Sequence, residues 1–86
     1  MRLQYTERFQ RAFAALTDAD AARVEKALRL LARDPRHPGL RVKRVRGTER
    51  IWEARASDAW RLTFEMHGDW LILRTVGAQD ATLKGP

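Results

Sequence analysis

Glu53, Arg55 and Arg61 occur at a spacing that could bring one carboxylate and two guanidinium groups together on one surface. Side chains of a strand alternate between its faces, so Glu53 and Arg55 share a face, and a hairpin turn at 57–58 brings Arg55 close to Ala59 or Arg61. Paired arginines can bind a phosphate and stabilise negative charge that builds up on it, and a neighbouring carboxylate can act as a general base. The same spacing is also typical of an ordinary cross-strand ion pair on a solvated sheet face, and the spacing alone favours that second interpretation.

The positive charge of the chain is concentrated in one segment. The formal net charge is +6, and residues 36–50 contribute +5 of it. This segment contains one acidic residue, Glu49, and six basic residues: Arg36, Arg41, Lys43, Arg44, Arg46 and Arg50. Such a stretch favours binding to nucleic acid or to an acidic protein. It fits contact with a phosphate backbone without sequence readout, although positive charge on a solvated edge strand also discourages aggregation.

The composition excludes several other kinds of site. The chain contains no cysteine, which excludes disulfides and thiolate metal ligands, and its two histidines, His37 and His67, are isolated in sequence. It also contains no Gly-rich phosphate loop and no Ser/His/Asp arrangement. No apolar run is long enough to span a membrane, and the first residues lack the apolar stretch of a signal peptide. We therefore expect one cytoplasmic domain over 1–86, with no metal, no other cofactor and no membrane contact.

Hydrophobic spacing predicts the elements that must position these residues. Alternation over 1–5 indicates a strand with one buried face, and two helices follow, with Thr6 and Thr17 as N-caps, the second ending before Pro35. Period-two patterns predict strands at four further places: 40–43, 51–56, 60–66 and 70–76. The tail over 80–86 is expected to form a helical turn. The fold class is therefore α+β, with an N-terminal strand and a helical hairpin packed on a mainly antiparallel, twisted sheet of about four to five strands.

Four short segments resemble, in their order along the chain, motifs of the RelE/ParE superfamily of toxin–antitoxin toxins. They are Val42-Lys43-Arg44-Val45-Arg46-Gly47, Ile51-Trp52-Glu53-Ala54-Arg55, Trp60-Arg61-Leu62-Thr63-Phe64 and Val76-Gly77-Ala78-Gln79-Asp80. The first is similar to the family's basic segment ending in glycine, the third to its aromatic-Arg-Leu-x-aromatic strand, and the last to its Val-Gly-x-His-Asp end. The resemblance covers nearly the whole chain and implies a strand, a helical hairpin and a three-strand meander.

Ribosome-dependent members of this family cleave mRNA in the decoding site. The 2′-hydroxyl attacks the adjacent phosphate and leaves a 2′,3′-cyclic phosphate, which requires a base, cations around the phosphate and an acid for the leaving 5′-oxygen. The resemblance implies that Arg61 holds the scissile phosphate, that Arg55 assists it and that Glu53 is the base. The expected contacts with the RNA backbone come from five cations: Arg41, Lys43, Arg44, Arg46 and Arg74. The face on which Arg74 lies is ambiguous from the sequence.

Gln79 stands where several relatives have the histidine or arginine that serves as the acid, and glutamine has no proton to give at a useful pKa. The departure has three interpretations: a weak enzyme or non-nuclease relative, a deliberate change made so that a toxic protein could be produced, or an acid supplied from elsewhere while Gln79 binds the substrate. The competing functions are therefore a ParE-like toxin that acts on DNA gyrase and a catalytically weak toxin-fold binding module. The resemblance and the positive charge imply an acidic or amphipathic antitoxin as partner, beside mRNA on the ribosome for the nuclease.

Overall fold

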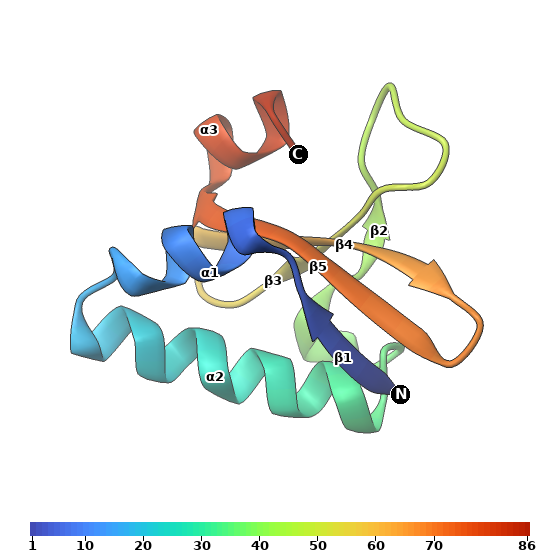
Figure 1. Ribbon diagram of the computed structural model, residues 1–86, viewed down its shortest axis with the longest axis horizontal. Coiled ribbons are helices and arrows are strands. Elements are labelled where there is room, and N and C mark those ends of the chain that lie inside the picture. Colours follow the sequence, from blue (N-terminus) through green and yellow to red (C-terminus); the bar gives the residue numbers. More distant parts are fainter.

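The computed structural model describes all 86 residues and consists of a five-stranded sheet with helices on both faces, joined by loops (Figure 1). The elements are β1 (Arg2–Tyr5), α1 (Glu7–Ala14), α2 (Asp18–Arg33), the 3₁₀ turn η1 (Pro38–Leu40), β2 (Lys43–Arg44), β3 (Trp52–Arg55), β4 (Trp60–His67), β5 (Trp70–Ala78) and α3 (Gln79–Lys84). The strand order is β1-β5-β4-β3-β2, with β1 parallel to β5 and the other pairs antiparallel. The predicted α+β class, with a mainly antiparallel sheet, is confirmed.

The N-terminal helices begin at the predicted threonine caps. The Oγ1 of Thr6 accepts a hydrogen bond from the Phe9 N–H at 3.1 Å, and that of Thr17 accepts one from the Asp20 N–H at 3.2 Å. These side chains satisfy N–H groups that the first helical turn leaves without partners. Helix α2 ends at Arg33, as expected from a proline at position 35. None of the helices combines the length and the apolar character needed to cross a membrane.

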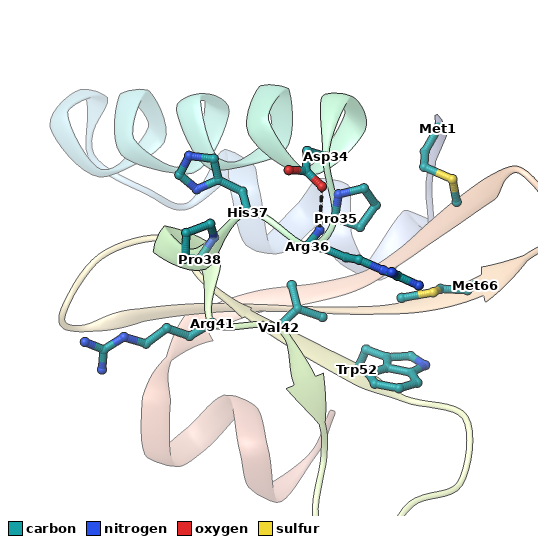
Figure 2. Close-up of a pocket in the computed structure, with 10 residues that line it drawn as sticks. All are labelled: Met1, Asp34, Pro35, Arg36, His37, Pro38, Arg41, Val42, Trp52 and Met66. Carbon is teal, nitrogen blue, oxygen red and sulfur yellow. Dashed lines mark hydrogen bonds between the residues drawn. The ribbon is translucent and has the colours of Figure 1, made fainter.

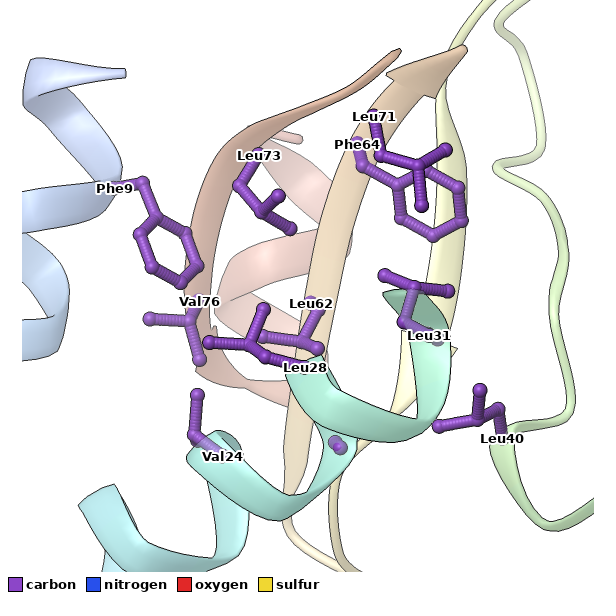
Figure 3. Packing of buried hydrophobic residues seen from close by; sticks show 12 residues of the cluster. Phe9, Val24, Leu28, Leu31, Leu40, Leu62, Phe64, Leu71, Leu73 and Val76 are labelled. Carbon is purple, nitrogen blue, oxygen red and sulfur yellow. The ribbon is translucent and has the colours of Figure 1, made fainter. Parts of the chain in front are cut away.

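The hydrophobic core lies between helices α1 and α2 and one face of strands β4 and β5 (Figure 3). Its fully buried side chains include Leu62 and Phe64 of β4, and Leu71 and Leu73 of β5, which meet Leu31 of α2. Burying one such side chain stabilises the fold by roughly 1.5–3 kcal/mol relative to leaving it exposed. Because side chains alternate along a strand, the residues of β3 and β4 that lie between core positions point to the opposite face of the sheet.

Two sequence expectations for the fold are wrong in part. The strand expected over 40–43 is reduced to Lys43–Arg44, because Pro38 begins a 3₁₀ turn that places Leu40 in the core, and Arg41 then adopts a left-handed φ of 48°. The buried face expected for the first strand is reduced to Leu3, which is partly buried and packs against the core, whereas Met1 and Tyr5 are exposed at the edge of the sheet. The expected meander of β3, β4 and β5 is confirmed, with Gly68 at φ 61° in the turn between the last two strands.

Candidate functional site

The candidate site lies on the outer face of the sheet, which we define as the face opposite the core. The register pairs Arg55 with Arg61, Glu53 with Thr63, and Lys43 with Glu53. Arg61, rather than Ala59, is thus the partner of Arg55 across the hairpin. The structure therefore brings together two arginines, a glutamate and a lysine that were predicted from the sequence.

Both arginines are held by the turn that joins β3 to β4. The Nη1 of Arg61 donates hydrogen bonds to the main-chain oxygens of Ser57 at 2.7 Å and Trp60 at 3.1 Å, with Asp58 at 3.3 Å. Arg55 forms an ion pair with the Asp58 carboxylate. A guanidinium carries five N–H donors, so Arg61 keeps its Nε and Nη2 groups for another acceptor. The turn thus fixes two cations in place and leaves donors available for an anion.

Glu53 is far less solvated than an ordinary cross-strand ion pair would be. Its side chain is only 7 % exposed, and the Nζ of Lys43 lies 3.9 Å from its Oε1. Thr63, its neighbour on β4, is completely buried. The expectation of a solvated sheet face is therefore wrong at these two positions. A carboxylate of low exposure beside a lysine is able to accept a proton from a bound hydroxyl group.

Gln79 lies at the same end of the sheet as the arginine pair. It is exposed at the start of α3, and its main-chain N–H donates to the oxygen of Ala59 at 3.0 Å, within the turn that holds Arg55 and Arg61. The register also pairs Arg61 with Gly77, two residues before Gln79. An exposed amide at this place can donate a hydrogen bond to a ligand on the outer face, but it cannot donate a proton.

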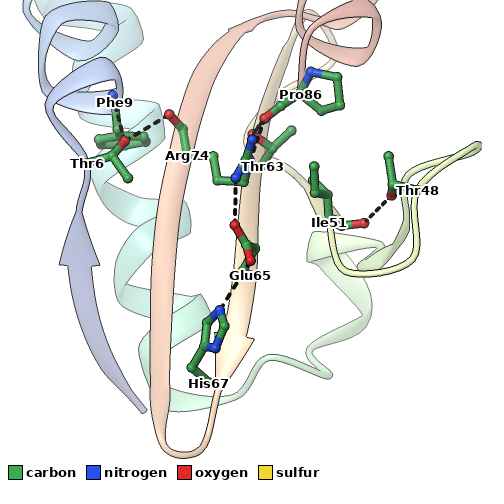
Figure 4. Close-up of polar contacts among 9 residues, drawn as sticks. All are labelled: Thr6, Phe9, Thr48, Ile51, Thr63, Glu65, His67, Arg74 and Pro86. Atoms are coloured by element: carbon green, nitrogen blue, oxygen red, sulfur yellow. Dashed lines mark hydrogen bonds and ion pairs between the residues drawn. The ribbon is translucent and has the colours of Figure 1, made fainter.

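Arg74 is the additional residue of a β-bulge, which resolves the ambiguity about its face. Thr63 pairs with Thr75 and Phe64 with Leu73, so Arg74 has no direct partner. Its Nη1 donates to Oε2 of Glu65 at 2.6 Å, and its Nε donates to the main-chain oxygen of Pro86 at 3.1 Å (Figure 4). Arg74 therefore faces the outer side of the sheet, between β4 and the end of the chain.

Glu65 is a member of this site that the sequence reasoning missed. Its Oε1 lies 3.2 Å from Nε2 of His67. The hydrogen bond from Arg74, and after it the one from His67, hold the pKa of Glu65 below its ordinary value. Side-chain alternation along β4 is consistent with Glu65 lying on the face of Arg61, but no sequence pattern indicates its partners. No three His, Cys, Asp or Glu side chains come together as metal ligands would.

The other predicted cations are distributed over different surfaces. Arg44 and Arg46 are exposed, and the loop over 45–51 rises from the sheet on the same side as α3 (Figure 1). Arg41 instead lines a cleft of about 710 Å³ together with Trp52 and Met66, between the end of α2 and the sheet (Figure 2). None of the other predicted site residues lines this cleft. The structure thus separates Arg41 from the arginine pair.

Solved structures of bacterial toxins align with this chain over nearly its whole length. YafQ from E. coli superimposes with a TM-score of 0.79 at 16% identity, over 95% of this chain and 98% of YafQ. The YoeB/ParE toxin from Agrobacterium tumefaciens gives 0.75 at 18% identity, over 92% and 99% of the two chains. A chain of the intact E. coli RelBE toxin–antitoxin complex gives 0.71 at 18% identity, over 91% and 95%.

The chain has the RelE/ParE toxin fold. The family resemblance seen in the sequence is thus confirmed at the level of the fold. No protein-family model and no curated protein sequence matches this chain. At such low identities the likeness concerns the backbone, and what the site does must be argued from its own side chains.

Proposed function

We propose that this protein is the toxin of a toxin–antitoxin pair and a metal-independent endoribonuclease that cleaves mRNA on the ribosome. One observation carries the proposal: Arg55 and Arg61 are direct neighbours on the outer face of a RelE/ParE-type sheet, beside a glutamate of low exposure. Two guanidinium groups next to a carboxylate are the set of groups needed to bind a phosphate and to remove a proton from a neighbouring hydroxyl.

In the proposed reaction the 2′-hydroxyl of the RNA attacks the adjacent phosphorus. Glu53 accepts the hydroxyl proton, the new O2′–P bond forms, and the bond from phosphorus to the 5′-oxygen breaks, which leaves a 2′,3′-cyclic phosphate. The free N–H donors of Arg61, assisted by Arg55, stabilise the charge on the non-bridging oxygens. Gln79 donates a hydrogen bond to the leaving 5′-oxygen, which takes its proton from solvent. Lys43 contacts the phosphate backbone of the RNA.

The chemistry of Gln79 favours a second candidate. Without an acid at this position, the leaving oxygen departs slowly, and the same basic face would serve binding rather than cleavage. This alternative is a ParE-like toxin that acts on DNA gyrase, or a toxin-fold binding module. The two candidates differ in one observable, which is whether RNA is cut.

An antitoxin partner is part of the proposal. The similar structures include complexes with antitoxins, the E. coli RelBE toxin–antitoxin complex and the E. coli DinJ–YafQ toxin–antitoxin complex. The net charge of +6 on this chain favours an acidic partner, because opposite charges speed association and fix orientation.

The test is primer extension on mRNA from a translation reaction, with and without ribosomes. We expect ribosome-dependent cuts inside codons, stronger cuts from Gln79→His, and a loss of about hundredfold or more from Arg61→Ala. Arg29→Ala, which removes an exposed arginine from α2, is the matched control and should cut like the unchanged protein. Cleavage retained by folded Arg61→Ala would remove Arg61 from the reaction. An absence of cuts from both the unchanged protein and Gln79→His would favour the second candidate and lead to gyrase assays.

A further inference from the structure

The edge of β4 is open where β3 ends. The last pair between these strands joins Trp52 to Phe64, whereas β4 continues to His67. Residues 65–67 therefore have no strand beside them on the side of β3. Trp52 lies on the core face with its pair partner, and Glu65 and His67 alternate to the outer face. The indole of Trp52 is only partly buried, so an aromatic side chain is accessible at this edge.

Three hollows meet at this edge and form one groove. The first, of about 420 Å³, opens beside Arg74 and Glu65 on the outer face. The second, of about 350 Å³, shares Glu65 and Arg50 with the first. It also shares Trp52 and Met66 with the cleft of about 710 Å³ at the end of α2 (Figure 2). We call this path, from the outer face to the end of α2, the edge groove.

The edge groove carries an arginine on each side of Trp52. Arg50 lines the second hollow and Arg36 lines the cleft; both are exposed, and neither takes part in an ion pair. Figure 2 shows Arg36 extending toward Met66, with Trp52 on the opposite wall of the cleft. The Asp34 carboxylate also lines the cleft, but its Oδ1 accepts a hydrogen bond from the main-chain N–H of Arg36 at 3.0 Å. Both guanidinium groups are thus available to an anion.

An aromatic face between cations is an arrangement that binds single-stranded nucleic acid, because a base stacks on the ring and the cations bind the backbone. The edge groove begins on the face that carries Arg55 and Arg61. Met66 follows Arg61 by five residues on β4, which is about 17 Å along a strand. A nucleic-acid strand in a duplex advances about 3.4 Å per nucleotide, so this separation corresponds to roughly five nucleotides. A segment of an acidic protein would also match the cations, but it gives no reason for the groove to continue from the arginine pair.

We propose that the edge groove holds the single-stranded RNA that flanks the cleavage point, with one base stacked on Trp52 and its neighbouring phosphates at Arg50 and Arg36. The choice of RNA rests on the proposed function, whereas the shape and charge of the groove do not depend on it. These residues position the strand and take no part in the cleavage reaction. Since every base has a stacking face, the groove adds affinity without selecting a sequence.

The test is a titration of the full-length, ¹⁵N-labelled protein with a single-stranded RNA octamer that is methylated at every 2′-oxygen and cannot be cleaved. We expect the indole Nε1–H signal of Trp52 to move along a saturation curve. Trp52→Leu keeps an apolar side chain against the core but removes the aromatic face, and it should weaken binding about fivefold to a hundredfold. Trp52→Phe keeps an aromatic face and should retain most of the affinity. Trp70→Leu, the same change at an indole that lines none of the three hollows, is the matched control and should bind like the unchanged protein.

The salt dependence of binding tests the two arginines separately from Trp52. Arg36→Gln and Arg50→Gln should each reduce the slope of log K against log salt concentration by about 0.7, because each removes one phosphate contact with a single strand. Arg33→Gln, which changes an exposed arginine of α2 outside the groove, should leave the slope unchanged. Glu49 lines the groove without an ion-pair partner, so Glu49→Gln should strengthen binding.

The edge groove is not an RNA site if the Trp52 signal does not respond to RNA. The same holds if folded Trp52→Leu and Arg36→Gln bind RNA like the unchanged protein, as is expected of a groove that takes an acidic protein segment. Binding that depends on Trp52 without Arg61-dependent cleavage of mRNA would retain the groove and reject the nuclease. Arg61-dependent cleavage, with RNA binding that is independent of Trp52 and Arg36, would reject the groove alone.

Discussion

Replacing Gly77 by alanine tests how tightly α3 is packed on the outer face. An added Cβ at Gly77 would lie 2.6 Å from Oγ1 of the buried Thr82, but 4.0 Å from the Cβ of that residue. The first separation is too short for two non-bonded atoms, so α3 or the Thr82 side chain must move. Overpacking of this kind costs about 1–3 kcal/mol. In a domain of this size each 1 kcal/mol lowers Tm by roughly 4–8 °C.

Urea unfolding of Gly77→Ala, Thr82→Ala and the double variant separates this contact from a general cost of alanine. Thr82→Ala removes the oxygen that the new methyl group would meet, and the remaining 4.0 Å separation is an ordinary contact. The double variant should therefore be more stable than the sum of the two single costs predicts, by about 1–2 kcal/mol. Gly77→Ala with unchanged stability, or a double variant with strictly additive costs, would refute the close packing of α3 on β5.

Three further predictions concern stability. Glu65→Gln should lower the free energy of unfolding at neutral pH, because Arg74 and then His67 hold the pKa of Glu65 below its ordinary 4.5. This stabilisation is present above about pH 4.5 and is lost as the pH falls through the lower pKa of the folded state. Urea unfolding measured across this pH range should therefore show the stabilities of the two proteins converging in acid. Thr17→Ala should cost about 0.5–2 kcal/mol in the same assay, and no loss would show that the cap does not form. Phe64→Ala should cost about 3–5 kcal/mol, and a loss below 1 kcal/mol would contradict its burial.

Much of the fold could be predicted because local signals and tertiary packing agree. Thr6 and Thr17 cap the helices as their residue types indicate, and Leu62 and Phe64 alternate as a half-buried strand must. The failure near Leu40 has a physical cause. Its alternation with Arg41 imitates a strand, yet the burial of Leu40 and the rigid φ of the preceding Pro38 favour a tight turn at that point.

Only the part of the site that follows from side-chain alternation along the strands could be predicted. Alternation placed Glu53, Arg55 and Arg61 on one face, and the register confirms that placement. It gave no indication that Thr63 would be covered, because the covering contact joins residues 23 positions apart and uses a main-chain oxygen. Every residue carries such an oxygen, so no residue type marks the one that will be used.

The internal partners of the outer-face arginines indicate what kind of ligand the face can accept. Arg61 donates to main-chain oxygens of its turn, Arg55 pairs with Asp58, and Arg74 donates to Glu65 and to the oxygen of Pro86. These contacts hold the guanidinium groups apart and oriented, which lowers the entropy that a ligand must overcome to order them. A neutral ligand offers no better acceptor than the oxygens already in place. Among these arginines, Arg61 is the one whose partners are all main-chain oxygens, because Arg55 and Arg74 already pair with carboxylates. An anionic oxygen forms a stronger hydrogen bond than those main-chain acceptors, so the contacts of Arg61 favour an anionic ligand over a neutral one.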